Sequence, residues 1–115
     1  MHELSICEAI VGRLRPYLEE NPGCRVRRVF VEIGRLSGVD PEALRFAFPA
    51  ATESAGLAGI ELEIARRPVT LRCGACGLEA EVKNFEMKCG ACGSPEVKIA
   101  GGRELKITSF EIEEE

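Results

Sequence analysis

Apolar and polar residues follow a helical period near the start of the chain. Within residues 4–20 the apolar positions recur at intervals of three and four, which places them on one stripe of a helix. Ser5 and Glu8 have the spacing of a capping box, so we expect Ser5 to cap this helix. Pro16 lies within the pattern and removes one backbone donor, so we also expect a kink or an early end there. Asn-Pro-Gly at residues 21–23 then stops the helix.

A strand, a second helix and another strand are predicted next. Residues 26–34 alternate between apolar and polar, which is typical of a half-buried strand. Asp40 followed by Pro41 opens a helix, because aspartate caps a first turn and proline fits the first helical position. Pro49 falls within this helix, and we expect it to disturb the middle. Residues 60–64 alternate again and predict a second strand.

The end of the chain completes the predicted layout. Residues 104–113 predict a last strand, and a change of apolar register between Ile107 and Phe110 indicates a bulge. The order of elements predicts an α+β fold (mixed α/β), with two helices packed on a sheet of about three strands. A small zinc-ribbon-like segment is inserted before the last strand. We therefore expect a discontinuous domain, formed by residues 1–67 plus 100–115, and a small inserted domain formed by residues 68–99.

The insert contains Cys-Gly-Ala-Cys-Gly twice, with twelve residues between the two pairs of cysteines. Two Cys-x-x-Cys pairs supply four thiolates, which is the ligand set of a closed tetrahedral zinc site. Disulfides or thiol redox chemistry are the alternative, but a redox protein needs only one such pair. The glycine after each second cysteine fits a tight turn with positive φ, and we expect its amide to point at sulfur. The expected zinc ligands are Cys73, Cys76, Cys89 and Cys92.

Charge and composition narrow the classes of function. The 115 residues include 15 Lys and Arg against 19 Asp and Glu, a net charge of −4, which argues against nucleic-acid binding. No segment is apolar for long enough to span a membrane and none resembles a signal peptide, so we expect a cytoplasmic protein. Arginines in or beside the predicted strands are interpreted as a solvated face rather than a basic patch. They are Arg25, Arg27, Arg28, Arg66, Arg67 and Arg72.

The only histidine is His2, and its position offers a second metal site. By default, a histidine at a chain terminus is a solvated residue. A free α-amine, two successive backbone amides and an imidazole can nevertheless surround one ion with nitrogen donors, a set that suits Ni(II) or Cu(II). The first amides of a helix are available for this role because they lack an intrahelical acceptor. From the residues alone, both interpretations of His2 stay open.

Several segments together resemble the HypA/HybF family, whose members are nickel metallochaperones for [NiFe]-hydrogenase maturation. The resemblance spans essentially the whole chain. It is carried by Met-His-Glu-Leu-Ser-Ile at the N-terminus, Glu-Ile-Gly at 32–34, Asp-Pro-Glu-Ala-Leu-Arg-Phe-Ala-Phe at 40–48, and the two Cys-x-x-Cys pairs.

The resemblance implies two metal sites and a set of partners. Nickel is expected at the Met1 amine, at His2 and at the backbone amides of His2 and Glu3, with the Glu3 side chain shaping the site. The cysteine quartet is expected to hold structural zinc. The implied partners are a maturation GTPase, the [NiFe]-hydrogenase large-subunit precursor and, in some organisms, urease accessory proteins, with no membrane or nucleic acid. The residues do not decide whether the chain forms a homodimer. Since the sequence has neither a phosphate-binding loop nor an evident nucleophile and base, we expect no enzyme.

Two other functions are compatible with parts of the sequence. A zinc-ribbon adaptor would use no second metal, but basic and aromatic residues near the cysteine pairs are sparse. A redox protein would keep one cysteine pair free of metal. Cys7 lies on the apolar stripe of the first helix and is interpreted as a buried structural thiol. Cys24 receives no role, and a disulfide between Cys7 and Cys24 stays open.

Overall fold

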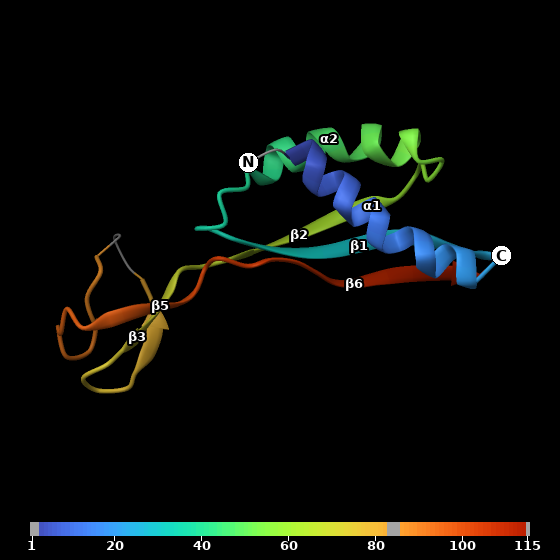
Figure 1. Ribbon diagram of the computed structural model, residues 1–115. Coiled ribbons are helices and arrows are strands. Elements are labelled where there is room, and N and C mark those ends of the chain that lie inside the picture. The colour runs from blue at the N-terminus through green and yellow to red at the C-terminus, as the bar shows by residue number, and fades with distance from the viewer. Residues whose placement is uncertain (1–2, 83–85, 115) are drawn as a thin grey trace.

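The computed structural model describes residues 3–82 and 86–114. The molecule is elongated, with extents of 55 × 24 × 16 Å, and a small sheet lies toward each end (Figure 1). The predicted α+β class is confirmed. In chain order the elements are α1 (Glu3–Glu20), β1 (Cys24–Gly34), α2 (Pro41–Ser54), β2 (Glu61–Arg67), β3 (Thr70–Cys73), β4 (Glu79–Glu81), β5 (Val97–Gly101) and β6 (Leu105–Glu114).

The first sheet has the strand order β2-β1-β6, and both helices cover one of its faces (Figure 1). β1 pairs in parallel with β2, through a crossover that contains α2, and antiparallel with β6. The apolar stripe of each helix meets the apolar face of the sheet, which forms the main core. Its buried members are Cys7, Ile10, Leu14, Val26, Val29, Val31, Ile33, Val39, Leu44, Phe48 and Ala51.

The first helix differs from one expectation for its proline. Each helix continues through its proline, so the early end predicted at Pro16 is wrong. Both prolines are exposed, so water can solvate the carbonyl that each one leaves without a helical donor. The predicted Ser5 cap is also wrong, because α1 already includes Glu3. The cap of α2 is confirmed, since Asp40 Oδ1 accepts a 3.0 Å hydrogen bond from the Glu42 amide.

The pairing of β1 with β6 contains two irregularities. One lies where Phe30 pairs with Ser109 and Val31 pairs with Ile107, so Thr108 is an extra residue on β6. This is the bulge that the register change of apolar residues predicted. It allows Ile107 and Phe110 to pack against the same core although three positions separate them.

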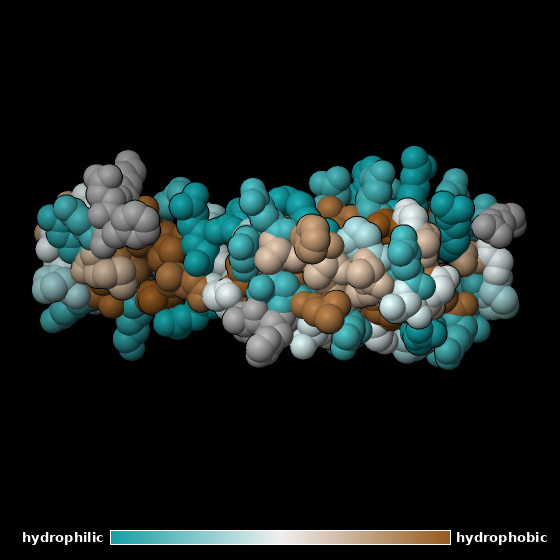
Figure 2. All heavy atoms as spheres, turned by 90° about the horizontal axis from the view of Figure 1, so that it is seen from above, coloured by the Kyte–Doolittle hydropathy of each residue, from teal (hydrophilic) through white to brown (hydrophobic). Residues whose placement is uncertain are grey.

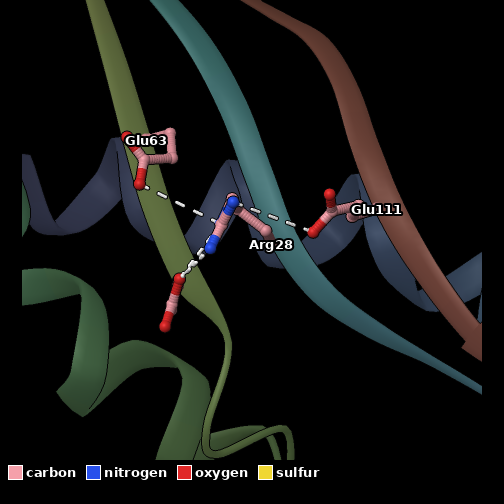
Figure 3. Close-up of polar contacts among 4 residues, drawn as sticks. Arg28, Glu63 and Glu111 are labelled. Carbon is pink, nitrogen blue, oxygen red and sulfur yellow. Dashed lines mark hydrogen bonds and ion pairs between the residues drawn. The ribbon is translucent and has the colours of Figure 1, made fainter.

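The face of the first sheet that points away from the helices is covered by ion pairs. Arg28 Nη2 lies 2.7 Å from Glu61 Oε2, and the same guanidinium lies 3.9 Å from carboxylates of Glu63 and of Glu111 (Figure 3). Arg67 Nη2 likewise lies 2.6 Å from Glu32 Oε1. These pairs neutralise the arginine charge locally, which supports the interpretation of a solvated face for Arg28 and Arg67.

The second sheet has the order β4-β3-β5, three short strands that the sequence analysis did not predict. Two segments, residues 68–69 and 102–104, connect it to the first sheet. They pass close together beside Gly34, the last residue of β1. The Gly34 N–H donates to the Glu104 carbonyl (2.8 Å), and the Leu36 N–H donates to the Gly102 carbonyl (2.6 Å). A Cβ at Gly34 would lie 2.1 Å from that Gly102 oxygen, so only glycine fits this crossing without displacement.

Candidate metal centre

The four cysteines of the two Cys-x-x-Cys pairs converge at one point of the second sheet. Cys73 is the last residue of β3 and starts a tight turn that carries Cys76. Cys89 and Cys92 lie on a matching turn that precedes β5. Cys73 and Cys89 are buried, whereas Cys76 and Cys92 are exposed. The four sulfurs lie within 4.8 Å of one another.

The two turns repeat the same hydrogen bonds, as their repeated sequence requires. In each, the amide of the first cysteine donates to the carbonyl five residues later, at 2.8 Å in one turn and 2.9 Å in the other. In each, the amide of the second cysteine lies 3.4 Å from the sulfur of the first. Gly77 and Gly93 have φ of 77° and 75°, as predicted. The expectation for their amides is wrong, because they donate to the carbonyls of Cys73 and Cys89 at 2.9 Å and not to sulfur.

The spacing of the sulfurs fits a small tetrahedral ion. Cys73 Sγ lies 3.6 Å from Cys92 Sγ, and Cys76 Sγ lies 3.7 Å from Cys89 Sγ. A regular tetrahedron with metal–sulfur bonds of about 2.3 Å has edges of about 3.8 Å. The contacts join one turn to the other, so an ion between the sulfurs would tie both turns together. Four protein ligands also complete a tetrahedron and leave no open coordination position.

Backbone amides favour negative charge on the first sulfur of each pair. They lower the pKa of Cys73, mainly through the Cys76 N–H, and lower the pKa of Cys89 to about 6, mainly through the Cys92 N–H. The Ser94 amide lowers the pKa of Cys92, but the neighbouring sulfurs together raise it by more. The pKa of Cys92 is therefore raised to about 11. Thiolates this close repel one another, so ionisation of all four is favoured only beside a cation.

Of the predicted nickel residues the structure describes only Glu3, which lies beside the first sheet. Met1 and His2 are outside the described residues. Glu3 opens α1 and is half-buried, and its amide belongs to the first turn, where N–H groups have no intrahelical acceptor. The start of α1 lies against the start of α2, because Cys7 Sγ is 3.6 Å from the Leu44 carbonyl oxygen.

The two remaining cysteines do not form the disulfide that the sequence left open. Cys7 and Cys24 are both free thiols. Cys7 is fully buried, as predicted, and burial is the main cause that raises its pKa to about 11. Cys24 is half-buried at the start of β1 and pairs with Glu114 across the sheet. Neither thiol therefore belongs to the sulfur cluster.

Comparison with known proteins places the whole chain in one family. Residues 1–112 match the family model described as hydrogenase/urease nickel incorporation, metallochaperone, hypA. The chain belongs to the HypA family. It is 38% identical to the hydrogenase maturation factor HypA of Nitrosospira multiformis over 112 residues, 97% of each protein. It is 42% identical to HypA of Chlorobaculum tepidum over 113 residues, 98% of this chain and all of that protein.

Solved structures of the HypA family share the fold. The solution structure of the Ni metallochaperone HypA from Helicobacter pylori superposes with a TM-score of 0.66 at 27% identity, with all of both chains covered. A second solution structure of a HypA protein gives a TM-score of 0.77 at 26% identity, over all of this chain and 98% of that one. The predicted resemblance is thus confirmed, and with it membership in a family of nickel metallochaperones for hydrogenase maturation.

No helix in the described part of the chain is long and apolar enough to cross a membrane.

Proposed function

We propose that this HypA-family chain carries Ni(II) at its N-terminus and delivers it to a hydrogenase, or a urease, under assembly. The observation that carries the proposal is the family match over residues 1–112, which includes both the N-terminal Met-His-Glu and all four clustered cysteines. Nickel would be bound by the Met1 amine, by His2 and by the amides of His2 and Glu3, with the Glu3 side chain nearby. Nitrogen donors of this kind suit Ni(II).

The start of α1 offers access to such a site. Leu4 is 51% exposed and Ser5 is exposed, so the first turn lies at the protein surface. A receiving protein can therefore bring its own ligands to an ion held there, and nickel can pass by ligand exchange without leaving protein donors. A carrier site needs this property, whereas a closed cage would retain its ion.

The cysteine quartet would hold a structural Zn(II) that stabilises a separate domain. In the described part of residues 68–99 the buried apolar side chains are only Leu71, Cys73 and Cys89. So small a core cannot offset the entropy lost on folding, so metal binding supplies the missing free energy. We assign residues 68–99 to this zinc-binding domain and residues 1–67 plus 100–115 to the nickel-binding domain.

The partners follow from the role in nickel incorporation. We propose a maturation GTPase as the source or co-carrier of nickel and the [NiFe]-hydrogenase large-subunit precursor as a recipient, with urease accessory proteins as an alternative recipient. The chain has no phosphate-binding loop, so nucleotide hydrolysis belongs to the partner. On this proposal the chain is a carrier in the cytoplasm and not an enzyme.

Calorimetric nickel titration tests the N-terminal site. The native chain, beginning with Met1 and carrying no tag, should bind about one Ni(II) per chain, and His2→Ala should abolish binding while the zinc content stays at about one per chain. A variant with one glycine added before Met1 keeps the histidine but displaces the amine, and it should bind more weakly. Equal binding by all three proteins would show that nickel binds elsewhere and that His2 is incidental, and absence of binding in all three would move the assignment to a zinc-ribbon adaptor.

Zinc removal tests the second site and the division into domains. Cys73→Ser should abolish zinc binding and the ordered amide signals of β3 to β5, while the helical circular dichroism of α1 and α2 remains. Cys24→Ser, a matched substitution outside the cluster, should leave zinc content unchanged. Loss of helical signal together with zinc would contradict the assignment of two domains.

A further inference from the structure

A groove separates α1 from the start of β6 on the helix side of the first sheet. In Figure 1, α1 and β6 run in the same direction, toward the end of the molecule that holds the C-terminus. Near that end the two elements touch, because the rings of Tyr17 and Phe110 pack edge to face with centroids 5.2 Å apart. Toward the other end, beside the small side chain of Ala9, a space of about 320 Å³ stays open, which is within the size range of ligand pockets.

The lining of this groove is mainly apolar. Val31 and Leu44 of the core form its floor, and Ile6 of α1 faces Leu105 and Ile107 of β6 across it. Leu105 is 41% exposed although it is a large apolar side chain. Figure 2, which looks down on the helices, shows apolar side chains at the surface of this layer, bordered by hydrophilic ones. An apolar groove that is open to solvent in this way marks an interaction site.

A cation without a partner borders the groove. Arg13 of α1 lines it and is exposed, and within residues 3–82 and 86–114 its guanidinium forms no ion pair. Lys106 also borders the groove, but its Nζ lies 3.6 Å from Glu32 Oε2 on the opposite face of the sheet. An anionic group of a ligand would therefore meet Arg13. We call the surface formed by Ile6, Ala9, Arg13, Leu105 and Ile107 the β6 groove.

The backbone of β6 beside the groove can form further hydrogen bonds. β6 is an edge strand, and no other strand in the described ranges covers its outer side. The Gly34 N–H donates to the Glu104 carbonyl, and pairs with and without hydrogen bonds alternate along antiparallel strands. Leu105 and Ile107 therefore direct their N–H and C=O groups away from β1, while their side chains face the groove. An added strand would use both features at once.

We propose that the β6 groove binds an extended peptide segment of another protein, which pairs antiparallel with β6. The segment carries an acidic residue two positions before a large apolar residue. The apolar residue lies opposite Leu105 and enters the groove beside Ala9. The acidic residue lies opposite Ile107, and its carboxylate meets the guanidinium of Arg13.

The spacing of the two anchor positions supports this pattern. Ala9 and Arg13 are four residues apart, which is about 6 Å along a helix. Side chains on one face of a strand repeat every two residues, or about 6.7 Å. The contact of Tyr17 with Phe110 places Arg13 level with Ile107 and Ala9 closer to the start of β6. An antiparallel segment therefore presents its acidic residue first and its apolar residue second.

A bound segment would lie beside the start of α1, since Ile6 is only one helical turn from Glu3. A protein that binds in the groove is thereby held close to the N-terminus of this chain. The inference does not rest on the proposed nickel site, because the contacts that carry it are those of the β6 groove alone. It can fail or succeed separately from nickel binding.

A titration followed by amide NMR signals tests the proposal on the zinc-loaded full-length chain. The probe is a synthetic peptide with blocked ends, acetyl-Thr-Thr-Glu-Thr-Leu-Thr-Thr-amide, added to about 2 mM because so small an interface binds weakly. The Leu105 and Ile107 signals should shift and saturate. Ala9→Leu fills the groove and should weaken binding about tenfold or more. Ala50→Leu, the same change at an exposed position of α2, should leave binding unchanged. Circular dichroism should show equal helix content in all variants.

Methylated peptides test the strand pairing. N-methylation of the glutamate and leucine amides of the peptide removes the two donors that point toward β6, and it should abolish binding. N-methylation of the threonine between them, whose amide points to solvent in an antiparallel pair, should leave binding largely unchanged. Equal effects of the two methylation patterns would overturn the proposed pairing.

A charge exchange tests the acidic position. Arg13→Glu should weaken binding of the peptide, and a peptide with lysine in place of glutamate should recover it, because opposite charges again meet. Arg45→Glu, at an exposed position of α2, should have no effect. Absence of saturable binding, or equal weakening by Ala9→Leu and Ala50→Leu, would overturn the proposal. Signals of the groove that depend on protein concentration and not on peptide would assign it to a second copy of the chain and also overturn it.

Discussion

Gly34→Ala should destabilise the protein strongly, because the two atoms nearest to the new Cβ would belong to the backbone. The new Cβ would lie 2.1 Å from the Gly102 oxygen and 2.2 Å from its carbonyl carbon. Relief requires a shift of the Gly102 segment, which would disrupt the hydrogen bond from the Leu36 N–H to that oxygen. Overpacking costs about 1–3 kcal/mol, and a lost backbone hydrogen bond costs about 1 kcal/mol. We therefore expect a loss of about 3 kcal/mol from the free energy of unfolding.

Gly12→Ala is the matched control, because it makes the same chemical change in a different environment. Gly12 is an exposed residue of α1, and a Cβ there would meet nothing within 4 Å. Alanine should stabilise the helix by about 0.5–1 kcal/mol. Urea unfolding monitored by helical circular dichroism would measure both free energies. The reasoning is refuted if Gly34→Ala is as stable as the native chain, or if the two substitutions change stability by the same amount.

Three further predictions concern the first sheet and its core. Phe48→Ala should lower the free energy of unfolding by about 3–5 kcal/mol in urea titrations, because this ring is only 1% exposed and its removal leaves a cavity. The hydrogen bond from Arg67 lowers the pKa of Glu32 in the folded protein. The stability that this carboxylate contributes should therefore be complete at pH values above its pKa in the unfolded chain. It should disappear as the pH falls through its lower pKa in the folded protein. The stability difference between the native chain and Glu32→Gln should therefore shrink with acid in urea titrations at several pH values, and a constant difference would contradict this. Cys7 should react with iodoacetamide far more slowly than Cys24 in the folded protein, since burial raises its pKa to about 11, and mass spectrometry of the zinc-loaded chain would follow both.

Much of the local structure was predictable because it depends on neighbours in sequence. The apolar spacing of residues 4–20 and the Asp40-Pro41 pair predicted both helices, and α2 begins where the pair placed it. The bulge in β6 was predictable for the same reason, since a change of register is visible within one strand. The two cysteine turns likewise follow from their own sequence, and both adopt the same backbone hydrogen bonds.

Errors arose where surroundings, rather than neighbours in sequence, decide the outcome. Proline removes a helical donor in any context, but the cost depends on whether water reaches the released carbonyl, and exposure of Pro16 and Pro49 is a property of the fold. β3 and β4 were missed because strands of three or four residues carry too short a pattern to detect, and they exist as a sheet only through their pairing.

By itself, the sequence determined which residues face a core and which four sulfurs can share an ion, because periodicity and spacing are local. Only the tertiary structure decided that β1 lies between β2 and β6, that the four sulfurs approach to 3.6–3.7 Å across two turns, and that Gly34 meets Gly102. Such contacts join residues far apart in the chain. They are selected by the joint burial of many side chains and the pairing of their backbones, which no single segment encodes.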